Sequence, residues 1–204
     1  MIDKIISEID FALKLFSVPP KGVRKNPADK ISKKSQVDDS ETIRFMRVNH
    51  SGEICAQGLY RGQLFFNNNN EISSALEKAA YEEIDHLNWC DQRLKELNGK
   101  TSRLNPFLYI GSIAFGAMAS KIDSKLNLGF LEETEKQVSA HLESHLKKIP
   151  KTDKKTHAIL QQMQLDEKKH EKTANQLGSK PLPKFFRSMM AISSKAMTKS
   201  TYWI

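Results

Sequence analysis

The sequence predicts an all-α fold, a four-helix bundle with a long apolar crossover and extra helices at its N- and C-terminal ends. Three observations lead to this prediction. Apolar residues recur at helical spacing in several long segments, and helix-ending signals such as Pro-Pro and Asn-Gly separate them. A motif that joins a lone glutamate to a Glu-x-x-His pair occurs twice. Between its two copies lies an unusually apolar stretch.

Residues 1–40 are expected to hold a short helix and a basic linker. Residues 2–16 place apolar side chains on one side of a helix, and Pro19-Pro20 ends it. Residues 21–39 are polar and basic, which is typical of a linker or surface arm with solvated lysines.

Residues 41–178 are expected to form the bundle. Its four helices are predicted at about 40–66, 71–97, 132–148 and 153–177. Asn98-Gly99 and Gly178 are stop signals, and Thr152-Asp153 is a suitable cap for the fourth helix. Glycines inside a helix cost up to ~1 kcal/mol each relative to alanine, so they often mark close packing. The glycines at 52, 58 and 62 therefore predict a partner helix close to Glu53.

Two apolar segments lie outside this pattern. The crossover, residues 100–127, is interpreted either as a buried connecting helix or as a lipid-facing element that also walls a channel for an apolar substrate. The tail, residues 179–204, is basic and amphipathic with terminal aromatic residues. We expect it to pack on the bundle, on a second subunit or on an anionic membrane surface, with the membrane favoured.

Composition limits the class of protein. A chain of 204 residues suits one domain, and the formal charge of +8 with a pI near 9.4 favours a partner with a negative surface. We expect anionic lipid and no nucleic acid, because no nucleic-acid motif is present. Two cysteines, Cys55 and Cys90, exclude a disulfide scaffold and fit a reducing cytosol. The longest apolar stretch, Pro106–Ala119, is too short to cross a bilayer.

The repeated motif indicates a metal site. A single Glu-x-x-His in a charged helix is usually a solvated face, but positions i and i+3 share a face and both pairs recur at equivalent points of two helical hairpins. A gap of about 30 residues brings an antiparallel helix level with the lone glutamate, at ~1.5 Å per residue. The two hairpins would then supply six ligands of a two-metal centre, as in ferritin-like bundles. These are Glu53, Glu83, His86, Glu135, Glu167 and His170.

This ligand set favours redox chemistry with oxygen. Carboxylates and imidazoles suit iron or manganese better than structural zinc. Four buried glutamates need cations to stay ionised, and two divalent ions would balance them. We therefore expect a pair of iron or manganese ions, which bind O₂ and use two electrons from a donor that the sequence leaves open.

Several segments together resemble the demethoxyubiquinone hydroxylases of ubiquinone biosynthesis, in their bacterial form. They are Arg47-Val-Asn-His-Ser-Gly-Glu53, Tyr60-Arg-Gly-Gln63, Glu82-Glu-Ile-Asp-His86, Glu132-Glu-Thr-Glu-Lys-Gln-Val-Ser-Ala-His-Leu142 and Asp166-Glu-Lys-Lys-His170. The resemblance covers residue 42 to the tail and implies a ferritin-like di-iron monooxygenase, with two carboxylate-bridged Fe ions per chain. Such an enzyme hydroxylates the ring of a polyprenylated demethoxyubiquinol. We expect it to bind peripherally to the cytoplasmic face of the cell membrane. A homo-oligomer is compatible with the resemblance.

The resemblance also implies roles for single residues. The six motif residues match the family's iron ligands, of which two glutamates bridge the irons, and the symmetry of the repeat favours Glu83 and Glu167. His141 matches a family histidine near the substrate, and it is either a satisfied core histidine or a group that delivers protons. Asp166 is expected to accept the second N–H of His86. Nothing is carried over to residues 1–40.

Four alternatives remain at this point. A ferritin-like iron-binding or ferroxidase protein would retain more than two iron atoms per chain. A ribonucleotide-reductase-like radical subunit needs a tyrosine beside the metals, for which the sequence offers no clear candidate among its four. A manganese catalase would turn over hydrogen peroxide alone, and a membrane adaptor would bind no metal.

Overall fold

In the computed structural model, residues 2–18, 21–32, 40–121 and 123–204 are described, and among them the regular elements are all helical. Along the chain these are α1 (Ile2–Ser17), the short 3₁₀ helix η1 (Pro27–Lys30), α2 (Ser40–Leu64), α3 (Asn70–Glu96), α4 (Asn105–Ser120), α5 (Ser124–Lys148), α6 (Lys154–Gln176) and α7 (Lys184–Trp203). The all-α prediction is confirmed.

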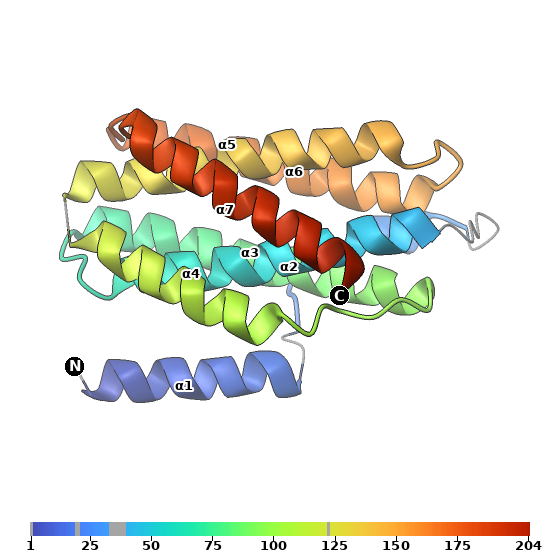
Figure 1. Ribbon diagram of the computed structural model, residues 1–204, viewed down its shortest axis with the longest axis horizontal. Helices are drawn as coiled ribbons and strands as arrows, with labels where there is room; N and C mark the ends of the chain where they lie inside the picture. The colour runs from blue at the N-terminus through green and yellow to red at the C-terminus, as the bar shows by residue number, and fades with distance from the viewer. Residues whose placement is uncertain (1, 19–20, 33–39, 122) are drawn as a thin grey trace.

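Two helical hairpins make the bundle. Helices α2 and α3 pack as one pair and α5 and α6 as the other, and the pairs meet through α3 with α6 and α2 with α5 (Figure 1). The long crossover between them contains α4, which lies along α2 (Figure 1). Helix α7 runs diagonally across the bundle, and α1 lies outside α4.

The apolar core of the bundle is divided into two clusters. One includes Phe45, Trp89, Leu142 and Met163, and the other includes Leu59, Leu76, Leu131 and Ala174. Both clusters draw on all four bundle helices. On each helix the residues of the repeated motif fall between the two, so the core holds a polar layer at its centre and apolar layers on both sides.

Capping chemistry explains most helix ends. Asn69 accepts hydrogen bonds from the first turn of α3. Asp153 accepts one from Thr156 N at 3.0 Å, which confirms the cap predicted for the fourth bundle helix. Asn98, rather than Gly99, takes the left-handed conformation after α3, with φ of 56°. Gly178 does so after α6, with φ of +85°.

The third bundle helix differs from its prediction. It was expected to begin at Glu132, but α5 begins at Ser124 with Asp123 as its cap. Residues 124–127 were counted with the crossover, and residues 128–131 were not assigned to a helix. Gly129 in this stretch is needed for close packing, since a Cβ there would clash with the carbonyl oxygen of Lys180. The extra two turns therefore belong to the bundle and pack against the segment before α7.

The glycines of α2 mark close packing, but not where it was expected. Cβ atoms at Gly58 and Gly62 would clash with the backbone of α4, and one at Gly116 would clash with the backbone of α2. A Cβ at Gly52 would meet nothing within 4 Å. The expectation of a partner helix close to Glu53 was therefore wrong for Gly52, which lines a cavity instead. Helices α2 and α4 approach each other one to three turns farther along.

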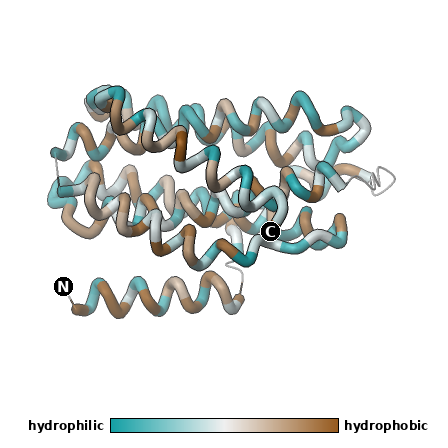
Figure 2. Tube along the Cα trace, viewed as in Figure 1, coloured by the Kyte–Doolittle hydropathy of each residue, from teal (hydrophilic) through white to brown (hydrophobic). Residues whose placement is uncertain are grey.

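The outer helices each keep an apolar face exposed. Figure 2 shows hydrophobic residues at intervals along α1, and its isoleucines are more than 40% exposed. Phe107, Ile110 and Met118 of α4 are exposed too. The interpretation of the crossover as a buried connecting helix therefore holds for only part of α4. Within the part of the chain that the structure describes, no helix combines the length and apolarity needed to cross a bilayer.

Candidate metal centre

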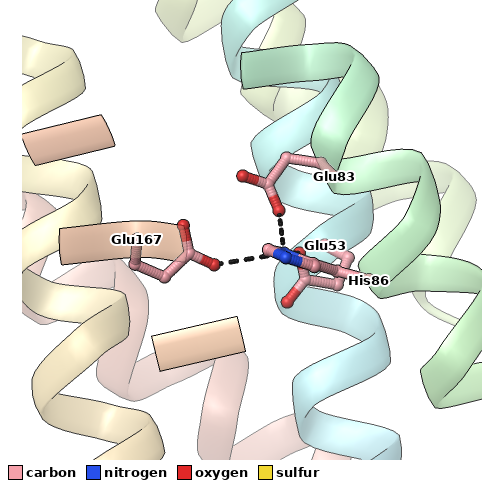
Figure 3. Close-up of side chains that lie close together, drawn as sticks. All are labelled: Glu53, Glu83, His86 and Glu167. Carbon is pink, nitrogen blue, oxygen red and sulfur yellow. Dashed lines mark hydrogen bonds and ion pairs between the residues drawn. The ribbon is translucent and has the colours of Figure 1, made fainter. Parts of the chain in front are cut away.

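The six residues of the repeated motif meet in the polar layer of the bundle. Each is almost completely buried, with His170 the most exposed at 6%. They form two overlapping groups, in each of which one ligand atom per residue lies within 4.8 Å of the others. The first group is Glu53, Glu83, His86 and Glu167 (Figure 3), and the second is Glu83, Glu135, Glu167 and His170.

The distances around each histidine describe a centre with two positions. His86 Nδ1 lies 2.7 Å from Glu83 Oε2 and 3.3 Å from Glu167 Oε1 (Figure 3), with Glu53 Oε2 at 3.7 Å. His170 Nδ1 lies 3.4 Å from one oxygen each of Glu83, Glu135 and Glu167. Glu83 and Glu167 therefore face both histidines, while each lone glutamate faces one.

The outer nitrogens of the histidines make reciprocal contacts across the bundle. His86 Nε2 on α3 lies 3.1 Å from Asp166 Oδ2 on α6, which confirms the contact expected from the sequence. His170 Nε2 on α6 lies 3.0 Å from Glu82 Oε2 on α3. Sequence reasoning missed Glu82, although the signal was present: an acidic residue precedes the glutamate of both Glu-x-x-His pairs. In this arrangement each imidazole can donate from Nε2 to a carboxylate while its Nδ1 faces the centre.

Burial and crowding shift the ionisation of these groups. Burial, and then the nearby carboxylates, raise the pKa of Glu53 and of Glu135. Burial also disfavours the charged form of Glu83, yet His86 outweighs it and holds the pKa of Glu83 well below its usual range. Burial alone would lower the pKa of the two histidines, but the surrounding carboxylates raise it far above its ordinary value. Without metal, protons therefore take up part of the cluster's negative charge.

The donor set fits metal ions. Glu83 Oε1, both carboxylate oxygens of Glu167 and Nδ1 of His170 are buried and make no hydrogen bond. Such atoms are costly in a protein interior unless a cation or a proton satisfies them. All of them face the centre, where hard oxygen donors and two imidazoles suit iron or manganese.

A tyrosine that the sequence left unassigned touches the centre. Tyr60 is fully buried on α2, and its hydroxyl donates a 2.5 Å hydrogen bond to Glu135 Oε1 on α5. Burial, and then the charge of Glu135, raise the pKa of this phenol well above 10, so it stays a hydrogen-bond donor. The spacing that pairs the lone glutamates with the Glu-x-x-His motifs gives no signal for this contact, because it joins the two hairpins.

An apolar cavity of about 400 Å³ leads toward the centre. Residues of α2, α4, α5 and α7 line it, among them Gly52, Cys55, Phe115, Val138 and Met197. A smaller space of about 40 Å³ shares Gly52, Val138 and Met197 with it and reaches Glu53 and His141. The crossover and the tail therefore wall the larger cavity, and the smaller space beside it borders Glu53.

His141 lies beside this small space and does not contact the six residues directly. Its Nε2 is buried without a hydrogen bond, while its ring packs on His145, whose Nδ1 lies 2.8 Å from Asn49 Oδ1. Burial lowers the pKa of His141 to about 4, so the ring is neutral near pH 7. A histidine that only fills the core would have both ring nitrogens hydrogen-bonded, whereas His141 has a buried Nε2 without a partner beside the smaller space.

Comparison with known proteins agrees with this geometry. A model of the family described as "Ubiquinone biosynthesis protein COQ7" matches residues 40–201, a span that includes the six residues of the centre. Proteins named 3-demethoxyubiquinol 3-hydroxylase are similar over nearly their whole length. The protein of Legionella pneumophila (strain Paris) is 45% identical, covering 100% of this chain and 97% of its own. That of Azoarcus sp. (strain BH72) is 44% identical over 99% of both. The chain belongs to the COQ7 family of ubiquinone biosynthesis proteins.

Proposed function

We propose that this protein is a monooxygenase that hydroxylates the ring of a polyprenylated demethoxyubiquinol, with O₂ and two electrons. The observation that carries the proposal is the centre itself: four glutamates and two histidines, buried between two helical hairpins, at the end of an apolar cavity. The names of the similar proteins support the same reaction. An iron-storage role finds no comparable support.

Two iron ions per chain are the metals proposed for the centre. Glu53 and His86 would serve one ion, Glu135 and His170 the other, and Glu83 and Glu167 would bridge them, because these two belong to both ligand groups. Bound iron would supply the activation of O₂ that a hydroxylation requires. The protein's part is to fix the ligands, through Asp166 and Glu82 on the histidines, and to keep the centre enclosed by apolar side chains.

The quinol would enter tail-last along the apolar route. The cavity between α2, α4, α5 and α7 suits the isoprenoid chain, and the ring would stop where the two spaces meet at Gly52, next to Glu53. At that position, His141 Nε2 would form a hydrogen bond with a ring hydroxyl of the quinol and transfer a proton to or from it. A neutral imidazole suits that role, since it either donates or accepts.

A quinol with an isoprenoid tail resides in a bilayer, so the protein would act at an anionic membrane surface. The exposed apolar residues of α1, α4 and α7 support peripheral binding, and the net charge of +8 supports attraction to anionic lipid. We place it at the cytoplasmic face of the cell membrane. Sedimentation with vesicles tests this proposal: binding should require anionic lipid and weaken with salt, and equal binding to neutral vesicles would contradict it.

The reaction is tested with purified protein, Fe(II), a chemical reductant, a demethoxyubiquinol and ¹⁸O₂. The wild type should bind two irons and place one labelled oxygen in the product. Glu167→Ala should lose most of its metal and all product, because a glutamate shared by both positions is removed. His141→Gln should keep the metal but lose at least about tenfold in turnover. Product from Glu167→Ala, or oxidation of iron without product in the wild type, would contradict the proposal.

A further inference from the structure

The segment before the bundle reaches the outside of the metal centre. This N-terminal strap, residues 21–31, carries η1 against α6 and places Ala28 in the core. Its backbone N–H groups at Val23 and Arg24 donate to Asp85 Oδ1 on α3, at 2.6 and 3.1 Å. A Cβ on Gly22 would lie only 2.6 Å from the same oxygen, so the close approach requires glycine. The strap is thus tied to α3 one residue before His86.

Arg24 links the two helices that carry the histidines. Its Nε donates to Asp85 Oδ2 on α3 at 2.6 Å, and its Nη1 donates to Asp166 Oδ2 on α6 at 2.7 Å. The guanidinium also lies over the ring of Trp89, 4.8 Å from its centroid. Both carboxylates are buried, so these charge-assisted bonds are less screened than surface ion pairs.

The carboxylate that Arg24 holds is the one that orients a histidine of the centre. Asp166 Oδ2 accepts from Arg24 and also from His86 Nε2, at 3.1 Å. Asp166 Oδ1 accepts from Gln162 at 3.2 Å, so both oxygens of this side chain are engaged. A fixed Asp166 in turn fixes the ring of His86 and the direction of its Nδ1 toward the centre.

The other half of the centre lacks such a brace. Glu82, which orients His170, has only Lys169 as a cationic neighbour among the described residues, at 3.8 Å, and the side chain of Lys169 is 58% exposed. An exposed ion pair of that length contributes little. Tyr60 restrains the second half at Glu135, but it does not touch either histidine's outer nitrogen. The repeat is therefore symmetric in its ligands and asymmetric in what orients them.

We propose that Arg24 is a positioning residue for His86 and that it makes the two metal positions unequal. The position served by His86 holds its ion more firmly, because the strap immobilises the Asp166–His86 pair. This inference rests on the proposed two-metal centre. It assigns a role in that centre to residues 21–31, which lie outside the span matched by the family model.

Metal release tests the inference without measuring turnover. Anaerobic protein loaded with two Fe(II) ions is mixed with a chromophoric Fe(II) chelator, and the release is followed in time. The wild type should release iron in two phases of equal amplitude. Arg24→Gln should speed the slow phase about tenfold or more and leave the fast phase unchanged, since outer-sphere partners of a metal ligand typically affect affinity by 10–100-fold. Arg24→Lys, which reaches only one of the two carboxylates, should be intermediate.

Control variants separate positioning from folding. Lys169→Gln, the corresponding change in the other half, should release iron as the wild type does. The thermal midpoint of the metal-free Arg24→Gln protein is measured in parallel with iron release. If Arg24→Gln does not fold, Arg24→Lys is used in its place. Wild-type kinetics in Arg24→Gln, or an equal acceleration of both phases, would overturn the inference. A wild type that binds no second iron would instead refute the two-metal centre on which it rests.

Discussion

Single residues in the centre work in pairs across the bundle. Each histidine presents Nδ1 inward because its Nε2 is held by a carboxylate of the opposite helix, Asp166 for His86 and Glu82 for His170. On each helix this carboxylate residue directly precedes the glutamate that faces the centre. One turn of α3 or α6 therefore supplies a candidate metal ligand and also orients the histidine of the opposite helix. The sequence could predict the ligands from i, i+3 spacing. It could not predict Tyr60 or Arg24, whose partners lie 75 and 61 or more residues away.

Tyr60 provides a test at this scale. Tyr60→Phe removes the hydrogen bond from the phenol to the buried carboxyl group of Glu135, so the metal-free protein should lose about 1–3 kcal/mol of unfolding free energy. Chemical denaturation of the metal-free protein measures this loss. The matched control is Tyr81→Phe on α3, at a side chain that is 57% exposed, which should change stability by less than about 0.5 kcal/mol. Equal stability of the two variants would contradict the importance of the Tyr60 contact.

Helices are positioned in this fold by backbone contacts as well as by apolar faces. The glycines of α2 and α4 bring these helices together, which places α4 as one wall of the cavity. Sequence patterns predicted the bundle helices and their caps, because those depend on neighbouring residues. They placed the start of α5 two turns late, because the first turns of α5 pack against the chain at Lys180, which is distant in the sequence.

The α2–α4 contact is tested with two helical glycines. Gly62→Ala would push a methyl group into the backbone of Ile113 and should lower the unfolding free energy by about 1–3 kcal/mol. Gly111→Ala, in α4 with nothing within 4 Å of the added Cβ, should raise it by up to about 1 kcal/mol through helix propensity. Thermal or urea unfolding of the two variants gives the answer. Destabilisation of both by the same amount would argue against close packing as the cause.

At the scale of the whole molecule, buried charge makes the metal-free protein sensitive to pH. The raised pKa values of His86, His170, Glu53 and Glu135 mean that the folded state binds protons which the unfolded chain has released. The stability from the two histidines is fully present below pH 6.5 and that from the two glutamates below about pH 4.5, and each is lost as pH rises through the raised pKa of the folded state. Other buried histidines act oppositely below pH 6.5, because burial lowers their pKa: His50 to about 4, His141 to about 4 and His145 to about 2.

We therefore expect the metal-free protein to lose about 1–3 kcal/mol of unfolding free energy per pH unit from pH 6.5 to 8.5. Denaturation curves at fixed ionic strength measure this slope. Protein loaded with two divalent ions should show a much smaller slope, since metal replaces the protons on the same atoms. A flat curve for the metal-free protein over that range would contradict a buried, proton-sharing cluster.

The amino-acid sequence by itself determined the all-α fold, the two hairpins and the six inward residues of the centre. These depend on helical periodicity and on spacing within one hairpin, which are local properties. Only the tertiary structure decided what lies around the centre: Tyr60 on Glu135, Arg24 on Asp166, the cavity beside Gly52 and the open nitrogen of His141. Those features join segments distant in the chain, and no local pattern encodes which distant side chains will meet.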